Sequence, residues 1–248
     1  MHKMTRKLRG SLWALGALGI ILPLCGAEGN KRLVEATNSQ TVPFQPGGTI
    51  HFNQSFGVLA IEGWDKPEVE ITVTKSLDQL AGTKDQAELA KHLEKVAIAV
   101  ERRSDTDLEI TTTVPHYSRL THPFGSTGGV MVEYQIHAPR NSKLVIQHGT
   151  GDVSATDMTA DIDATVHNGD IVLMLPESGL YSIDAKSKLG TVWSDFDGDF
   201  QRRHLMGTQY AHPGAAPAHR IFLRMGTGGI TIKSSPPSAH PPATASVQ

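Results

Sequence analysis

The sequence predicts an all-β fold, a right-handed parallel β-solenoid of the β-helix type with one short packed helix. Of its 248 residues, 24 are glycine and only 6% are aromatic, a balance typical of chains that turn often and build thin β layers. A pattern of strand, glycine and strand recurs at steps of about 20 residues. Its apolar positions and its glycine keep the same offsets in every copy, which predicts stacked coils that bury a shared apolar seam.

The pattern consists of an apolar residue that begins a strand, a glycine two places before it, and a pair of apolar residues further upstream. In the copy that begins at Val153 these are Gly151, Ile146 and Leu144. Residues two apart face the same side of a strand, and glycine allows the backbone to turn with φ above zero. Four more copies fit, with strand-starting residues Leu59, Ile171, Val192 and Ile230, glycines Gly57, Gly169, Gly190 and Gly228, and upstream pairs Ile50 and Phe52, Ile162 and Ala164, Ile183 and Ala185, and Ile221 and Leu223.

A β-sandwich of consecutive hairpins is the alternative fold, because short strands joined by regular turns also occur there. A sandwich does not require the apolar positions and the glycine to keep the same offsets, and this favours the solenoid. The step from Val192 to Ile230 is about twice the others, so we expect a loop at 207–219 to take the place of one coil.

Other segments predict a sheet that leads into the repeats. Residues 57–76 give two alternating strands around the turn GWDKPE, and a capping box followed by an apolar stripe predicts a helix over 84–96. Val69, Ile71 and Val73 share one face of the second strand. Further strands are expected at 97–102, 108–114 and 130–139, with an irregular loop at 115–129.

The two ends of the chain are expected to lie outside the fold. Residues 1–27 have the basic start, short apolar run and small residues of a signal peptide cut after Ala27. Cys25, the only cysteine, is the alternative site of a lipoprotein signal, although Leu24 is large for the position before it. The mature chain then has neither a disulfide nor a membrane span. Its parts are an N-terminal segment at 28–49, a β domain at 50–233 and a disordered proline-rich tail at 234–248.

Several of these segments together resemble a known family. The stretch GVLAIEGWDKPEVEITVTK, the strand VEYQIHAPRNSKLVIQ and the successive turns GTGDVSA and HNGDIVLM look like the bacterial putative adhesin domains of unknown function. The similarity covers roughly residues 50 to 233. It implies a β-helix-like fold in an exported envelope protein, with adhesion as a role attached largely by analogy. The copies LGTV and TGGI lack the aspartate of the family's Gly-Asp turns, so only the glycine is common to all five.

Acidic residues are the first candidates for a metal site. Asp152 and Asp170 follow the glycines of two copies, but two other copies lack the acid and an aspartate in a turn usually bonds the backbone. Asp195, Asp197 and Asp199 alternate in DFDGDF as calcium ligands do, yet Met206 stands where an EF-hand needs glutamate. We expect a polar turn there, and whether these three residues bind a metal stays open.

Histidines and nucleophiles offer little more. His148 and His167 open the two Gly-Asp fragments, but in the aligned copies His148 corresponds to Val166, and no zinc-binding spacing occurs. No Gly-x-Ser-x-Gly motif is present, and the glycine-rich GSTGG lacks the lysine of a phosphate-binding loop. The sequence therefore predicts no catalytic, cofactor-binding or metal-binding residue.

The sequence as a whole favours a non-enzymatic protein of the periplasm, cell envelope or extracellular space. Its partner is expected to be an envelope or surface component, protein or glycan, held by many modest contacts on a repetitive β surface. The net charge of -2 gives no basic excess, so nucleic acid is not an expected partner. The alternative is a polysaccharide-active or calcium-dependent β-helix enzyme, which would use Arg202, Arg203 and the acids at 195–199.

Overall fold

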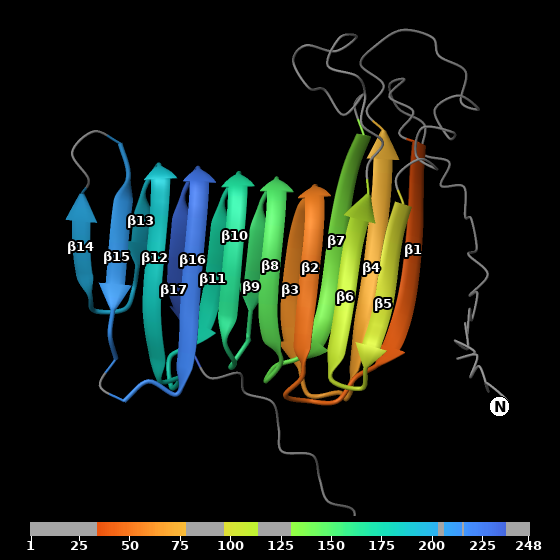
Figure 1. The fold of residues 1–248 in the computed structure, drawn as a ribbon, viewed down its shortest axis with the longest axis horizontal. Coiled ribbons are helices and arrows are strands. Elements are labelled where there is room, and N and C mark those ends of the chain that lie inside the picture. The colour runs from red at the N-terminus through yellow and green to blue at the C-terminus, as the bar shows by residue number, and fades with distance from the viewer. Residues whose placement is uncertain (1–33, 78–96, 114–129, 203–205, 215, 237–248) are drawn as a thin grey trace, which may run out of the picture.

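The computed structural model describes residues 34–77, 97–113, 130–202, 206–214 and 216–236. This part of the chain is all-β, as expected, and contains no helix (Figure 1). The helix predicted over 84–96 and the loop predicted at 115–129 lie outside the described residues, and so do the signal peptide and most of the tail. Within the described ranges no helix is long and apolar enough to cross a membrane.

The strands form two mixed sheets that lie one behind the other (Figure 1). Sheet A has eight strands, in the spatial order β1 (Val34–Pro43), β4 (Glu68–Leu77), β7 (Val130–Pro139), β3 (Val58–Trp64), β9 (Val153–Thr156), β11 (Ile171–Pro176), β17 (Ile230–Ser235) and β13 (Val192–Ser194). Sheet B has nine, in the order β14 (Asp199–Arg202), β15 (Thr208–His212), β12 (Tyr181–Leu189), β16 (His219–Thr227), β10 (Ile162–Asn168), β8 (Lys143–Thr150), β2 (Thr49–Phe56), β6 (Asp107–Thr113) and β5 (Ala97–Ser104).

The five copies of the sequence pattern stack side by side, each giving one strand to sheet B and the next to sheet A. They pair in parallel and in the register that the sequence predicts. In sheet B the aligned residues run Ile50, Leu144, Ile162, Ile221 and Ile183. In sheet A they run Leu59, Val153, Ile171, Ile230 and Val192.

The order of the last two copies differs from the prediction. The copy β16–β17 lies between β10–β11 and β12–β13 instead of following the latter. The expected loop at 207–219 is also partly wrong, because it contains β15, whose Tyr210 is fully buried. β15 pairs antiparallel with one edge of β12 and occupies it. The strand of the next copy, β16, can therefore pair with β12 only along the other edge.

The glycine of each copy lies at the corner where the chain passes from sheet B to sheet A. Gly169 and Gly228 have φ values of +131°, which L side chains rarely adopt. A Cβ atom on Gly228 would also overlap the carbonyl oxygen of Gly169, and one on Gly169 would overlap that of Gly151. Gly57, Gly151 and Gly190 share the positive φ. Two separate constraints therefore exclude every other residue from these corners.

The core lies between the two sheets and is built from the inward positions of nearly every strand. Val69, Ile71 and Val73 are all buried, which confirms their predicted common face. A small polar group also lies inside, where the Tyr134 hydroxyl of sheet A is 2.5 Å from the Thr112 hydroxyl of sheet B, which in turn donates to Gln54 Oε1. This contact joins the two sheets across the interior.

The β fold extends slightly beyond the boundaries expected from the sequence. β1 lies within the segment 28–49 and pairs along its whole length with β4. β17 continues to Ser235, which is buried, so the last ordered strand includes the first two residues of the expected tail.

The adjacent residues Gly228 and Gly229 provide a matched test of the glycine corners. We expect Gly228→Ala to lower the free energy of unfolding by about 1–3 kcal/mol or more, because it combines a strained φ with a clash against backbone. Gly229→Ala should cost less, since the nearest atom to its Cβ would be an Asp170 carboxylate oxygen at 3.2 Å and the nearest backbone atom the Thr191 oxygen at 3.9 Å. Urea unfolding of both variants measures the difference, and equal losses would contradict the proposed role of the corner.

Candidate functional site

The aspartates of the Gly-Asp turns are structural. Asp152 Oδ1 accepts a hydrogen bond from the backbone N–H of Asp170 at 2.9 Å, and Asp170 Oδ1 accepts one from that of Gly229 at 2.6 Å. Each carboxylate thus accepts a bond from the backbone of the neighbouring copy of the pattern. These bonds tie adjacent copies together and give the two acids a structural role.

The DFDGDF stretch forms the expected polar connection, between β13 and β14. Asp195 Oδ2 accepts a hydrogen bond from the backbone N–H of Ser234 at 3.0 Å, and the Asp197 carbonyl accepts one from His212 Nδ1. Asp199 begins β14. In the described ranges no three His, Cys, Asp or Glu residues are grouped so that they could hold a metal ion.

His148 and His167 lie in different environments, as their alignment predicts. His148 pairs with Val166 in the sheet and is buried, whereas His167 is exposed. His148 Nε2 is 2.9 Å from the carbonyl oxygen of Gly57 and donates to it. Burial lowers the pKa of His148 despite that bond, so its ring is neutral at pH 7. It is therefore a core residue that links β8 to a glycine corner.

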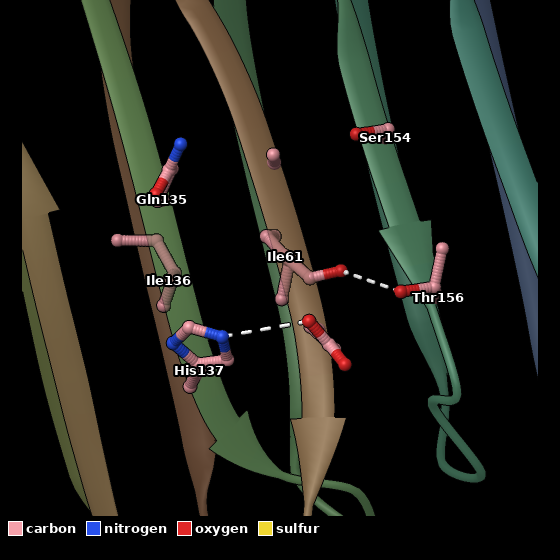
Figure 2. A pocket seen from close by; sticks show the side chains of 8 residues that line it. Ile61, Gln135, Ile136, His137, Ser154 and Thr156 are labelled. Carbon is pink, nitrogen blue, oxygen red and sulfur yellow. Dashed lines mark hydrogen bonds and ion pairs between the residues drawn. The ribbon is translucent and has the colours of Figure 1, made fainter.

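A hollow lies on the outer face of sheet A, over β7, β3 and β9 (Figure 2). Its volume is about 370 Å³. The register places Ala60 between Gln135 and Ser154. The methyl group of Ala60 is shorter than the side chains of Gln135 and Ser154 on either side of it, and this difference in length produces the hollow.

A second row of polar side chains borders this hollow. His137, Glu62 and Thr156 are neighbours in the register, one from each strand. His137 Nε2 is 3.4 Å from Glu62 Oε2, and the Thr156 hydroxyl donates to the carbonyl of Ile61 at 3.4 Å (Figure 2). Both side chains remain in contact with solvent, so the interaction between them is weak.

The Gly-Trp-Asp turn contacts this hollow through His137. The ring of Trp64 stacks on that of His137 with centroids 5.2 Å apart, and Lys66 Nζ lies 4.3 Å from the Trp64 ring. Beyond the turn lies a second hollow of about 320 Å³, lined in part by Trp64, Asp65 and Arg140. Arg140 donates two hydrogen bonds to the Asp65 carboxylate, at 2.6 and 3.0 Å. We call the two hollows and these turn residues the Trp64 corner.

The Trp64 corner brings together hydrogen-bonding groups of several kinds. Hydroxyl, carboxamide, imidazole, carboxylate and guanidinium groups converge there on a rigid sheet. Such a set can hold a polar ligand by many contacts. The sequence singled out its Gly-Trp-Asp turn but missed Gln135, His137 and Ser154, because their neighbours come from strands far apart in the chain. The alternation of inward-facing and outward-facing residues along 130–139 could have revealed Gln135 and His137 in the sequence, because it places both on the outward face of the strand.

No family model and no curated protein matches the chain. Among solved structures, it is similar to a putative cell adhesion protein from Clostridium sporogenes, with 16% identity, coverage of 81% of this chain and 100% of the other, and a TM-score of 0.49. A putative adhesin from Bacteroides fragilis shows 10% identity, coverage of 81% and 97%, and a TM-score of 0.25. One from Parabacteroides distasonis shows 11% identity, coverage of 84% and 98%, and a TM-score of 0.24. These names agree with the resemblance seen in the sequence.

The buried His148 predicts a specific acid sensitivity. Because its pKa is lowered in the folded state, the unfolded chain takes up a proton first as the pH falls below about 6.5, and stability is lost from there downward. The loss approaches about 1.4 kcal/mol for each pH unit. His148→Val, which copies Val166 of the next coil, should flatten the dependence between pH 7 and 5 in urea unfolding. The same slope in both proteins would contradict the assignment.

The polar connection at 195–199 predicts no calcium binding. Calorimetric titration of the mature chain with calcium should give no binding heat, because Asp195 is already bonded to the backbone of β17. A micromolar site that disappears in the Asp195→Ala, Asp197→Ala double variant would overturn this expectation.

Proposed function

We propose that this chain is a non-enzymatic protein, exported to the bacterial cell envelope or beyond it, that binds an envelope or surface component at the Trp64 corner. The partner is a protein or a glycan that lies on the outer face of sheet A. We further propose that the two sheets form one right-handed parallel β-solenoid, in which each of the five copies of the glycine pattern forms one coil of the stack.

The hollow around Ala60 is the observation that carries this function. Sheets present mostly flat outer faces, and here the register brings a small residue between polar ones on three hydrogen-bonded strands. The backbone under the hollow is fixed by pairing on both sides, so little ordering is needed when a ligand binds. Affinity then comes from several modest polar contacts.

The solenoid proposal is supported by the shared register of the copies. The same positions of all five align in sheet B and again in sheet A, as expected of coils that stack. A sandwich of independent hairpins would show antiparallel pairing of consecutive strands at these positions. The right-handed sense follows the strong general preference of parallel crossovers.

The non-enzymatic proposal is supported by the use of the candidate acids in structure. The carboxylates of Asp152, Asp170 and Asp195 all accept hydrogen bonds from the backbone of a neighbouring strand or of the turn before it. Arg202 lies on β14 at the far end of the molecule from the Trp64 corner (Figure 1), and Arg203 is outside the described residues.

A matched pair of tryptophan substitutions tests the site. Ala60→Trp fills the hollow from an outward-facing position, and Val145→Trp places the same side chain on an outward-facing position of sheet B. Binding of each labelled protein to isolated bacterial envelopes and to a glycan array is measured. We expect Ala60→Trp to weaken binding about tenfold or more, which is about 1.4 kcal/mol, and Val145→Trp to leave it unchanged.

Two results would count against the proposal. Equal binding of wild type and both variants would remove the Trp64 corner from the interaction. Release of new reducing ends from the glycans during incubation would show that the chain is an enzyme.

A further inference from the structure

Within the described part of the chain, the end of the molecule formed by β13, β14 and β15 exposes several large apolar side chains. Four large apolar side chains between residues 189 and 206 are exposed, with Phe200 51% and Trp193 50% accessible to solvent. The other two are Leu189 and Met206. Removing apolar surface of this size from water is favourable, so a partner that covers it would be stabilised by the contact.

Phe200 faces the interior side of sheet B although it is exposed. It pairs directly with Tyr210, which is fully buried, and the two ring centroids are 4.7 Å apart. Sheet B ends at β14, whereas the last strand of sheet A is β13, which touches β15 and β12 (Figure 1). The core side of β14 is therefore left uncovered, and Phe200 continues the core past the last strand of sheet A.

The free edge of β14 has a charge pattern that complements itself. The sequence around it reads DFDGDFQRR, acidic before the strand and basic at its end. Within the described residues neither Asp199 nor Arg202 has a hydrogen-bond or ion-pair partner for its side chain. When a strand of this pattern pairs antiparallel with an identical one, each acidic start meets the basic end of the other.

We propose that a second copy of this chain docks on this end, with the two β14 strands paired antiparallel about a two-fold axis perpendicular to sheet B. This axis keeps the interior faces of both copies on the same side. In the register that places Gln201 opposite Gln201 of the second copy, Phe200 lies opposite its Arg202. Each Phe200 then contacts a cation and loses its exposure, and the two sheets B form one continuous sheet.

Cysteine cross-linking tests the pairing directly. The chain from Glu28 onward contains no cysteine, so Gln201→Cys introduces a single thiol. In the proposed dimer the two thiols lie across one strand spacing and should form an intermolecular disulfide on mild oxidation. Gln209→Cys, on the same outer face of β15, is the matched control. Its two copies would lie three strand spacings apart, about 14 Å, which is beyond the reach of a disulfide.

Charge reversal tests the self-complementarity by sedimentation over a concentration series. Arg202→Glu should weaken dimerisation about tenfold or more, because it places a carboxylate against Phe200 of the second copy, and Arg202→Lys, which keeps a cation there, should preserve it. Glu177→Lys, in the exposed turn before β12, should change nothing. A wild-type chain that stays monomeric throughout, cross-linking of Gln209→Cys as fast as of Gln201→Cys, or an Arg202→Glu variant that dimerises like wild type would each overturn the proposal. Unchanged melting temperatures of the variants confirm that they fold.

Discussion

The close approach of backbone to backbone at the glycine corners is the constraint on which the rest of the structure depends. The amide N–H of Gly151 donates to the Asn168 carbonyl at 2.9 Å, and that of Gly169 donates to the Thr227 carbonyl at 3.1 Å. These two corners are therefore hydrogen-bonded to the neighbouring copy of the pattern. A Cβ at any of these corners would occupy the place of a neighbouring carbonyl. If a strand slipped by one residue against its neighbour, a residue with a side chain would replace the glycine beside that carbonyl. The glycine corners therefore fix the register of sheets A and B together.

A locked register decides what the outer faces look like. Because strands in one sheet are aligned residue by residue, their outward side chains form rows across the sheet. The row through Gln135, Ala60 and Ser154 contains the hollow, and the adjacent row brings His137 to Glu62. The Trp64 corner is therefore a product of alignment between coils. Its residues on β3 are far in the chain from those on β7 and β9, but the residue-by-residue pairing of the three strands makes them neighbours.

The sequence predicts the repeat far better than it predicts the order of the repeats or the site. Apolar spacing and glycine are local signals, and they place Val153, Ile171, Val192 and Ile230 in one register without further information. The order of the copies depends on which strand edge is still unpaired when each copy joins the sheets. That was decided by β15, whose short pattern around Tyr210 is surrounded by Gly, Pro and Ala and has the composition of a loop. The site required cross-strand neighbours, which a single strand does not specify.

The two ends of sheet B handle their free edges differently. At β5 the pairing with β6 is irregular between Arg102 and Ser104, and Arg102 forms an ion pair with Asp105, so this edge is distorted and its charge is balanced locally. At β14 the pairing is regular, the charges have no described partners, and an aromatic ring from the core side is left exposed. A stack of repeated units buries its apolar interior only between neighbouring units. The strand at each end therefore needs either an irregular pairing like that of β5 or another strand that covers it. The β14 end has the regular backbone and the apolar surface of an edge that is covered by another strand.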